Sequence, residues 1–214
     1  MEKLERVLDA LEEHYGLEPR NWHTRQDVFE VLIGTVLSQR TKDENTDKAA
    51  QALFARYDNP KKLAEADVKS IEKLIRPSGF YKVKAKRIKE ISKIILQKYR
   101  SKVPKKMEEL LSLPGVGRKT AGCVLVYGFG IAESIPVDTH VHRISNRLGI
   151  VKTKTPEQTE KELMRIVPKK EWININQLLV VHGQNICRPI SPKCNVCPVN
   201  KYCSYYKNVY LVEK

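Results

Sequence analysis

The chain has 214 residues, with 39 Lys and Arg against 25 Asp and Glu, and therefore a net charge of +14 at neutral pH. Because a domain usually holds roughly 100 to 200 residues, this length allows one or two domains. An excess of positive charge favours a polyanionic partner, although a basic surface that serves only solubility stays open on charge alone.

The sequence holds no run of about 18 uninterrupted apolar residues, and its first residues lack the apolar segment of a secretory signal. We therefore expect no membrane association and a cytoplasmic, prokaryotic-type protein without a targeting signal. Four of the five cysteines fall within residues 187–203, and in a reducing compartment such a group indicates metal ligands rather than disulfides. Cys123 lies in an apolar run and is expected to be a small buried hydrophobe.

Apolar residues recur at intervals of three and four along most of the chain, as at Val28, Leu32 and Val36. This spacing is typical of amphipathic helices, so the sequence predicts an all-α fold of roughly ten helices. Turn-forming residues separate helices of roughly 10 to 15 residues. The interruptions fall at residues 57–60, 77–79, 104, 114–115, 135–136 and 155–156.

A basic run lies inside one of these helical patterns. Such a run can contact phosphates or can form a solvated helix face, and both interpretations stay open. Its members are Lys82, Lys84, Lys86, Arg87 and Lys89.

Residues 113–121 read Leu-Pro-Gly-Val-Gly-Arg-Lys-Thr-Ala and lie between helical patterns at 107–111 and 120–127. The pattern predicts a helix, a tight hairpin and a second helix within about 107–127. Gly115 and Gly117 let the backbone turn sharply, and amides at the start of the second helix then point toward an anion such as a phosphate. A lone Gly-x-Gly ends many helices without any ligand, but the whole string is more specific.

Asp138 precedes a helical pattern formed by Val141, Ile144 and Leu148, so its position predicts an N-terminal helix cap. His182 lies in another helical segment without a partner at metal-ligand spacing, and we expect a core histidine there.

The C-terminal cysteines follow the pattern Cys187-x6-Cys194-x2-Cys197-x5-Cys203. Four thiolates require a soft metal, and both tetrahedral zinc and a cubane iron–sulfur cluster accept four cysteines. Ligand chemistry alone leaves both open.

Taken together, these motifs resemble the endonuclease III family of helix-hairpin-helix DNA glycosylases along nearly the whole chain. Leu37-Ser38, the hairpin, Val137-Asp138-Thr139-His140 and the spaced cysteines occur in the family's order. The resemblance implies a helical barrel domain at 21–132 that holds the hairpin. It also implies a helical iron–sulfur domain formed by 1–20 with 133–214, with a [4Fe-4S] cluster in the loop 187–203.

The resemblance implies a monomeric, bifunctional DNA glycosylase and abasic-site lyase of base excision repair, associated with the nucleoid. Its substrate would be double-stranded DNA with a damaged pyrimidine or an abasic site. In the family, the lysine at the position of Lys119 attacks the sugar to form a Schiff base, and β-elimination then cleaves the strand. A helix N-terminus and Arg118 are expected to lower the pKa of Lys119. The aspartate at the position of Asp138 is the family's catalytic carboxylate, and the two side chains are expected to meet between the domains.

Further DNA contacts are implied by the same resemblance. Arg188 and Lys193 would contact phosphates, although a solvated loop is the alternative. The family places a plug glutamine shortly after Leu-Ser, and here Arg40 aligns with it while Gln39 comes one residue earlier, so either is a candidate. Asp43 is interpreted either as a pocket-lining carboxylate or as a helix cap. The hairpin residues expected to contact DNA are Gly115, Gly117, Arg118 and Thr120.

Two other functions are compatible with the same sequence. A monofunctional mismatch glycosylase would remove thymine or adenine with water as the nucleophile. A non-catalytic DNA-binding module would use the hairpin only for phosphate recognition. Lys119 argues against the first, and Lys119 together with Asp138 argues against the second.

Overall fold

The structure is a computed structural model, and it describes residues 2–16 and 27–212. Every regular element in these residues is helical, which confirms the predicted all-α fold. The chain divides into two compact units: a hairpin unit, Asn21–Glu133, and a cysteine unit, Met1–Arg20 with Ser134–Lys214. The boundary that the sequence predicts between residues 20 and 21 lies outside the described residues. In the described ranges no helix is long and apolar enough to cross a membrane.

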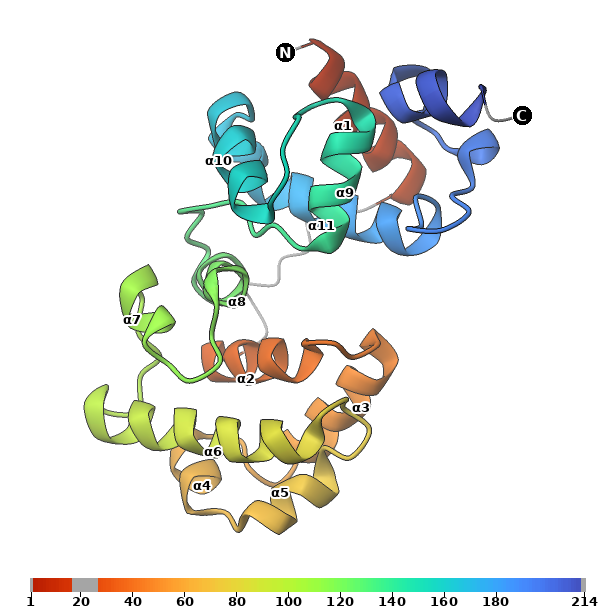
Figure 1. Cartoon of the computed structure of the whole chain (residues 1–214). Coiled ribbons are helices and arrows are strands. Elements are labelled where there is room, and N and C mark those ends of the chain that lie inside the picture. The colour runs from red at the N-terminus through yellow and green to blue at the C-terminus, as the bar shows by residue number, and fades with distance from the viewer. Residues whose placement is uncertain (1, 17–26, 213–214) are drawn as a thin grey trace. The chain divides into compact units, whose positions relative to one another are not determined.

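The hairpin unit is built around α6, which has α2 on one side and α4 and α5 on the other (Figure 1). Leu32 of α2 and the α6 residues Ile88 and Ile91 are fully buried in its core. Burial of these apolar side chains is the main force that holds the helices together. The helices are α2 (Val28–Ser38), α3 (Asp43–Phe54), α4 (Pro60–Glu65), α5 (Val68–Leu74), α6 (Tyr81–Lys98), α7 (Met107–Leu111) and α8 (Arg118–Cys123), which continues as a π-helical turn at Val124–Gly128.

Several helices are shorter than the sequence pattern predicts, and local capping explains two of them. The Asn59 side chain accepts a hydrogen bond from the Lys62 amide, and Pro60 occupies the first position of α4. Asp67 caps α5 in the same way by accepting from the Ser70 amide. Because each cap starts a new helix, residues 60–74 form two short helices instead of one long one.

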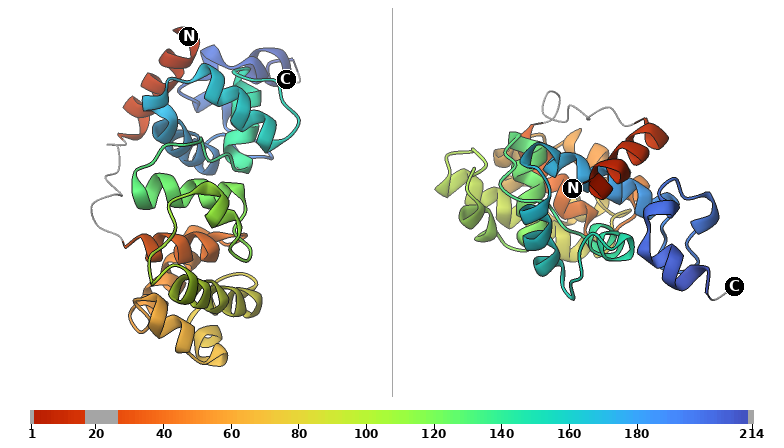
Figure 2. Two further views of the ribbon diagram at one scale, coloured as in Figure 1. Left: turned by 90° about the vertical axis from the view of Figure 1, so that its left-hand side faces the viewer. Right: turned by 90° about the horizontal axis from the view of Figure 1, so that it is seen from above.

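In the cysteine unit, α1 and α9 both pack against α11 (Figure 2). Tyr15 at the end of α1 places its hydroxyl 3.0 Å from Nδ1 of His182, and Lys3 donates to the Leu148 carbonyl over 2.6 Å. The two ends of the chain therefore share one core. The elements are α1 (Glu2–Tyr15), α9 (Thr139–Leu148), α10 (Pro156–Ile166) and α11 (Trp172–Asn185), with short turns at Lys169–Glu171, Cys194–Val196, Asn200–Tyr202 and Tyr206–Tyr210.

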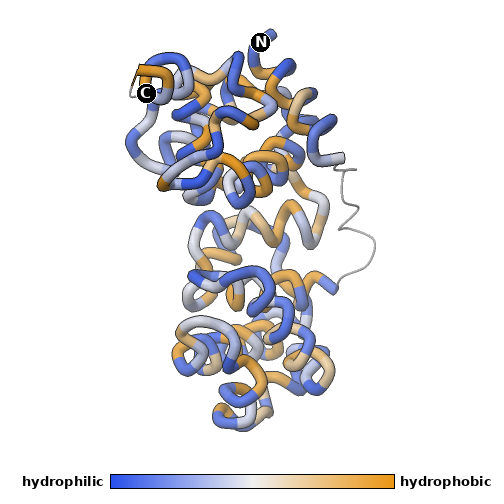
Figure 3. The backbone as a smooth tube through the Cα atoms, turned by 90° about the vertical axis from the view of Figure 1, so that its right-hand side faces the viewer, coloured by the Kyte–Doolittle hydropathy of each residue, from blue (hydrophilic) through white to orange (hydrophobic). Residues whose placement is uncertain are grey.

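Hydrophobic and hydrophilic colours alternate along the helices of each unit in Figure 3, as expected for helices with one buried face. The basic run departs from that simple pattern, and neither interpretation of it holds for the whole run. Lys84 is only 2% exposed, because it follows the helical phase of Ile88 and Ile91 into the core. Lys89 donates to the Ala66 carbonyl over 2.6 Å. Of the five residues in the run, only Lys82 and Lys86 are exposed, and Arg87 and Lys89 are half-buried.

Candidate active site

The hairpin places Lys119 at the start of a helix. α8 begins at Arg118, two residues earlier than the sequence pattern predicts, so Lys119 is the second residue of the helix. The side chains of Arg118 and Lys119 are exposed, whereas Thr120 is buried. A cation at this point of the chain therefore faces solvent next to backbone amides at a helix start.

Gly115 is required by both conformation and space. Its φ is +71°, a left-handed conformation that side chains other than glycine adopt at a cost. A Cβ built on Gly115 would lie 2.1 Å from Nε of Arg87, so the hairpin backbone sits directly against that guanidinium. Gly117 differs, since a Cβ built there meets nothing within 4 Å.

The end of α2 joins the hairpin through the amide of Gln39. Its Nε2 donates to the Gly115 carbonyl over 3.0 Å and to Oγ1 of Thr120 over 3.2 Å. Its Oε1 accepts from Nη1 of Arg87 over 3.2 Å. The Gln39 side chain is therefore engaged inside the hairpin unit at both ends of its amide.

Arg40 lies beside this junction and faces outward. It is exposed, its φ is +51°, and its guanidinium carbon lies 5.8 Å from the centre of the Phe80 ring. Phe80 is also left-handed, with φ +57°, and is 63% exposed. Sequence reasoning missed Phe80, although an aromatic residue directly after Ser78-Gly79 and before a helix was a usable signal.

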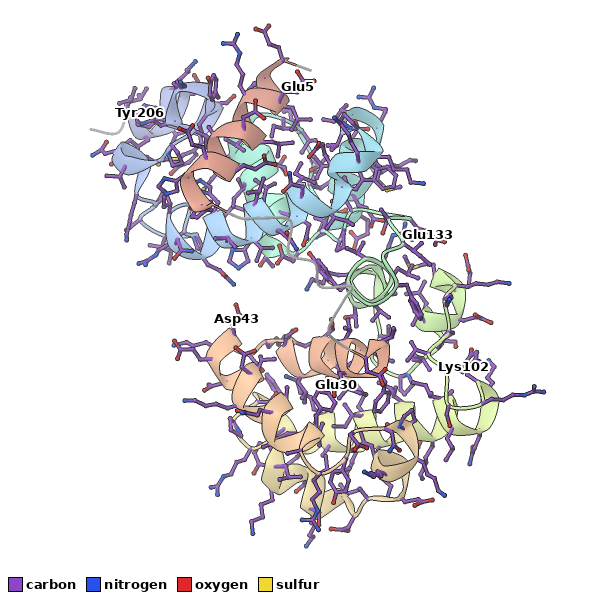
Figure 4. All side chains as sticks on the ribbon, turned by 180° about the vertical axis from the view of Figure 1, so that it is seen from behind. Glu5, Glu30, Asp43, Lys102, Glu133 and Tyr206 are labelled. Carbon is purple, nitrogen blue, oxygen red and sulfur yellow. The ribbon has the colours of Figure 1, made fainter. Side chains whose placement is uncertain are left out.

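Asp138 caps α9, as its position predicts. Its Oδ1 accepts from the amides of His140 and Val141 over 2.8 and 2.9 Å, and the side chain is half-buried. Asp138 belongs to the cysteine unit and Lys119 to the hairpin unit. The alternative cap at Asp43 is wrong by one position, because Lys42 precedes α3 and Asp43 is its first residue (Figure 4).

The four C-terminal cysteines surround one cavity in the cysteine unit, which apolar side chains also line. Among the described residues, no three Cys, His, Asp or Glu side chains converge as ligands of a single ion do. A cubane cluster places its irons at separate corners, so its ligands surround a volume rather than a point. The arrangement of Cys187, Cys194, Cys197 and Cys203 around a cavity fits that requirement.

Burial of these thiols sets their protonation in the absence of an occupant. Burial raises the pKa of Cys197 to about 12 and also raises the pKa values of Cys194 and Cys203. Nη1 of Arg147 lies 3.5 Å from the sulfur of Cys187. Because burial disfavours the thiolate form, ligation by these cysteines requires cationic charge in the cavity such as iron provides.

His182 is the core histidine that the sequence predicts. It is 1% exposed, burial lowers its pKa to about 4, and its Nε2 lies 3.5 Å from the sulfur of Cys197. Cys123 is buried at 4% exposure, which confirms its interpretation as a core residue.

The loop between the first two cysteines is held from α9. Arg147 donates to the carbonyls of Arg188 and Pro189 over 2.7 and 2.9 Å, and its guanidinium lies over the Tyr205 ring at 4.6 Å. The side chains of Arg188 and Lys193 are exposed. The loop therefore has a fixed backbone and two exposed cations.

Comparison with known proteins agrees with the motifs. The model of the HhH-GPD superfamily of base excision DNA repair proteins matches residues 33–169, so the chain is a protein of that class. Endonuclease III of Thermotoga maritima is 52% identical, with 88% of each chain covered, and that of Synechocystis is 40% identical, with 83% of this chain and 81% of the relative covered. The chain belongs to the endonuclease III family, whose members are DNA glycosylases and abasic-site lyases.

Solved structures show the same relationship. A trapped endonuclease III–DNA covalent intermediate is 34% identical to this chain, with a TM-score of 0.87 and 96% of both chains covered. A thermostable thymine-DNA glycosylase is 26% identical, with a TM-score of 0.81 and coverage of 96% of this chain and 97% of that chain.

Replacing Gly115 with alanine is expected to lower the free energy of unfolding by about 2 kcal/mol or more, because the left-handed backbone and the contact with Arg87 both oppose a Cβ. Gly117→Ala is the matched control and should cost no more than about 1 kcal/mol, the size of a lost helix-cap preference. Urea denaturation of both variants measures the difference. Equal losses would contradict the role assigned to Gly115.

Proposed function

We propose that this protein removes oxidised pyrimidines from double-stranded DNA with Lys119 as the nucleophile and then cleaves the strand by β-elimination. The observation that carries the proposal is Lys119 itself, an exposed amine in the first turn of α8, on a hairpin fixed through Gly115. The likeness to a trapped endonuclease III–DNA covalent intermediate supports it, because a covalent intermediate requires a nucleophile on the protein.

The chemistry proceeds in two stages. The lone pair of Lys119 Nζ forms a bond to C1′ while the glycosidic bond breaks, and the base leaves with the bonding electrons and takes up a proton. Nζ then loses a proton, and its lone pair forms a double bond to C1′ while the bond from C1′ to O4′ breaks and O4′ takes up a proton. The product is a protonated imine between Nζ and C1′ on an opened sugar. Removal of a proton from C2′ expels the 3′ phosphate, which is the strand-cleaving β-elimination.

Asp138 is proposed to stabilise the positive charge that develops on the sugar and to accept the proton from Lys119. A carboxylate near a cationic transition state lowers the barrier electrostatically. The two hydrogen bonds from His140 and Val141 hold Oδ1 of Asp138 in place, so its orientation is set before DNA arrives. Capping and catalysis are compatible roles for one carboxylate.

Binding of DNA is proposed to use the net charge of +14 and two contact regions. Backbone amides at Gly115, Gly117 and Thr120, with the Arg118 side chain, would contact phosphates. Thr120 contributes its backbone here, because its side chain is buried and accepts from Gln39. The second region consists of the exposed side chains of Arg188 and Lys193.

Reaching C1′ requires that the nucleotide leave the helix stack and that the gap be filled. Of the two plug candidates we favour Arg40, because the Gln39 amide is engaged with the hairpin and Arg40 is exposed. Phe80 lies next to Arg40 and offers the apolar ring that proteins insert between base steps.

One chain carries all of these elements, so we propose that a cytoplasmic monomer acts on DNA of the nucleoid.

Cys187, Cys194, Cys197 and Cys203 are proposed to hold a [4Fe-4S] cluster. The cluster would supply an architectural cross-link and no step of bond chemistry, since base loss and β-elimination transfer no electrons. It would fix the loop that carries Arg188 and Lys193 against α9, where Arg147 already holds the backbone.

Borohydride added during turnover should trap the wild-type protein on lesion DNA, because it reduces the imine to a secondary amine that water does not hydrolyse. Lys119→Gln should form no adduct and no strand break while its affinity for DNA changes less than about threefold.

Duplexes containing thymine glycol, dihydrouracil, uracil and a G·T mismatch establish the preferred base. Base release without an adduct from wild-type protein would contradict the mechanism. On a G·T substrate, that result would favour a mismatch glycosylase, which the thymine-DNA glycosylase likeness makes the second candidate.

Asp138→Asn separates capping from catalysis, because asparagine caps helices about as well as aspartate. We expect the melting temperature to change little, while single-turnover base excision slows by about 100-fold or more through loss of the negative charge. Asp138→Ala is the comparison variant that loses both functions. An Asp138→Asn enzyme with full activity would show that Asp138 only caps α9.

Protein purified without oxygen should be brown, absorb broadly in the visible region, and contain iron and acid-labile sulfide in equal amounts. Chelation of the iron should lower the melting temperature, because the cysteine unit loses its cross-link. Cys123→Ser is the control, since Cys123 is buried apart from the cavity that the other cysteines line. Zinc without sulfide would show that the four cysteines hold a single ion.

A further inference from the structure

The side-chain amine of Lys84 is buried at the C-terminal end of α2. The side chain comes from the first turn of α6 and is 2% exposed. Its Nζ lies 2.7 Å from the Leu37 carbonyl oxygen and 2.6 Å from the Gln39 carbonyl oxygen. It also lies 2.9 Å from each of two hydroxyl oxygens, Oγ1 of Thr41 and Oγ of Ser78.

A buried cation costs free energy unless its hydrogen bonds are satisfied, and this site satisfies them. Three N–H groups meet four acceptors, two of which are carbonyls at the C-terminal end of α2, where a positive charge is favourable. Burial lowers the pKa of Lys84 to about 8, with a smaller contribution from the charge of Arg87, so the amine keeps its proton at neutral pH. Each N–H group of the ammonium therefore has an oxygen acceptor.

The ammonium joins two loops that are far apart in sequence: the α2-end loop, residues 37–41, and the α6-start loop, residues 78–80. Three further bonds connect them. The Ser78 hydroxyl donates to the Leu37 carbonyl over 2.9 Å, the Gly79 amide donates to Oγ1 of Thr41 over 3.0 Å, and the hydroxyl oxygens of Thr41 and Ser78 lie 3.4 Å apart. Lys84 binds acceptors in both loops and so lies at the centre of their junction.

Each loop carries one residue in a costly conformation that points outward. Arg40 has φ +51° and Phe80 has φ +57°, and neither is glycine. Such conformations persist only where surrounding contacts enforce them. The backbone oxygens that Lys84 binds lie within three residues of Arg40, and Ser78 lies two residues before Phe80.

We propose that Lys84 is a positioning residue for nucleotide eversion, and that its ammonium fixes the α2-end and α6-start loops so that Arg40 and Phe80 occupy the gap. The inference rests on the proposed function, in which these two residues contact DNA. Lys84 touches neither the substrate nor the reacting atoms. Its effect is largest at the step in which the lesion leaves the stack.

The test compares one lesion in two duplexes: thymine glycol opposite adenine, and thymine glycol opposite a stable abasic-site analogue. The second lesion has no pairing partner, so its eversion depends less on gap filling. Lys84→Met should slow single-turnover excision opposite adenine about tenfold more than opposite the analogue, the effect of losing about one charge-assisted hydrogen bond. A general loss of structure would slow both duplexes equally.

Lys89→Met is the matched control, because Lys89 is on the same helix and its amine also binds a carbonyl, that of Ala66, away from both loops. For Lys89→Met, the ratio of the excision rate opposite the analogue to the excision rate opposite adenine should equal that of the wild type. Thr41→Val removes one acceptor of Lys84 and, with it, the acceptor of the Gly79 amide, with almost no change in volume. It should shift the ratio in the same direction by about threefold, and an unchanged ratio would show that the junction does not control eversion. This variant decides the question if Lys84→Met fails to fold.

An unchanged ratio in folded Lys84→Met, or in Thr41→Val where the first does not fold, would overturn the inference. Failure of the proposed function has a different signature, since wild-type protein would then form no borohydride adduct on either duplex. A trapped wild type with an unchanged ratio in the variants rejects the role of Lys84 alone.

Discussion

One buried charge holds the end of α2, which carries Gln39 and Arg40. The Lys84 ammonium binds the last carbonyls of that helix, and the helix end in turn positions Gln39. The Gln39 amide then binds the hairpin at Gly115 and Thr120, directly beside Lys119. A short series of polar contacts therefore runs from the core of the hairpin unit to the hairpin that carries the proposed nucleophile. The bonds of Lys84 to these carbonyls and of Gln39 to Thr120 are buried or half-buried, where hydrogen bonds are stronger than in water, whereas the bond of Gln39 to Gly115 is exposed.

Much of the fold was predictable because the sequence repeats simple signals. The spacing of apolar residues predicted helices, and the Pro, Gly and Asn clusters marked their ends. Asp138 was predictable as a cap because an acidic residue stood directly before an amphipathic pattern, and the structure shows both hydrogen bonds. The cysteine spacing likewise indicated one metal site, and the four side chains do surround one cavity.

The remaining features depend on tertiary contacts that no linear pattern contains. Gln39 and Arg40 are neighbours of similar polarity, and only the position of the hairpin decides which one is engaged and which is exposed. Lys84 was misread as part of a charged run, although it shares the helical phase of Ile88 and Ile91. The helical phase of Lys84 was visible in the sequence and indicated burial. Buried lysines are rare, however, so the charge of the side chain led to the prediction of an exposed residue. Its acceptors come from residues 37–41 and 78, which sequence alone does not bring together.

The cysteine unit draws its core from both ends of the chain, because α1 packs on α11 and Tyr15 reaches His182. During synthesis α1 leaves the ribosome first, yet its partner follows more than a hundred residues later. The hairpin unit is continuous in sequence and has its own core, so it can fold before α11, the partner of α1, has been synthesised. Loop closure over such a distance slows folding, and prior folding of the hairpin unit shortens the flexible chain that must be closed. The order of translation therefore favours completion of the nucleophile's unit before the cysteines have been made.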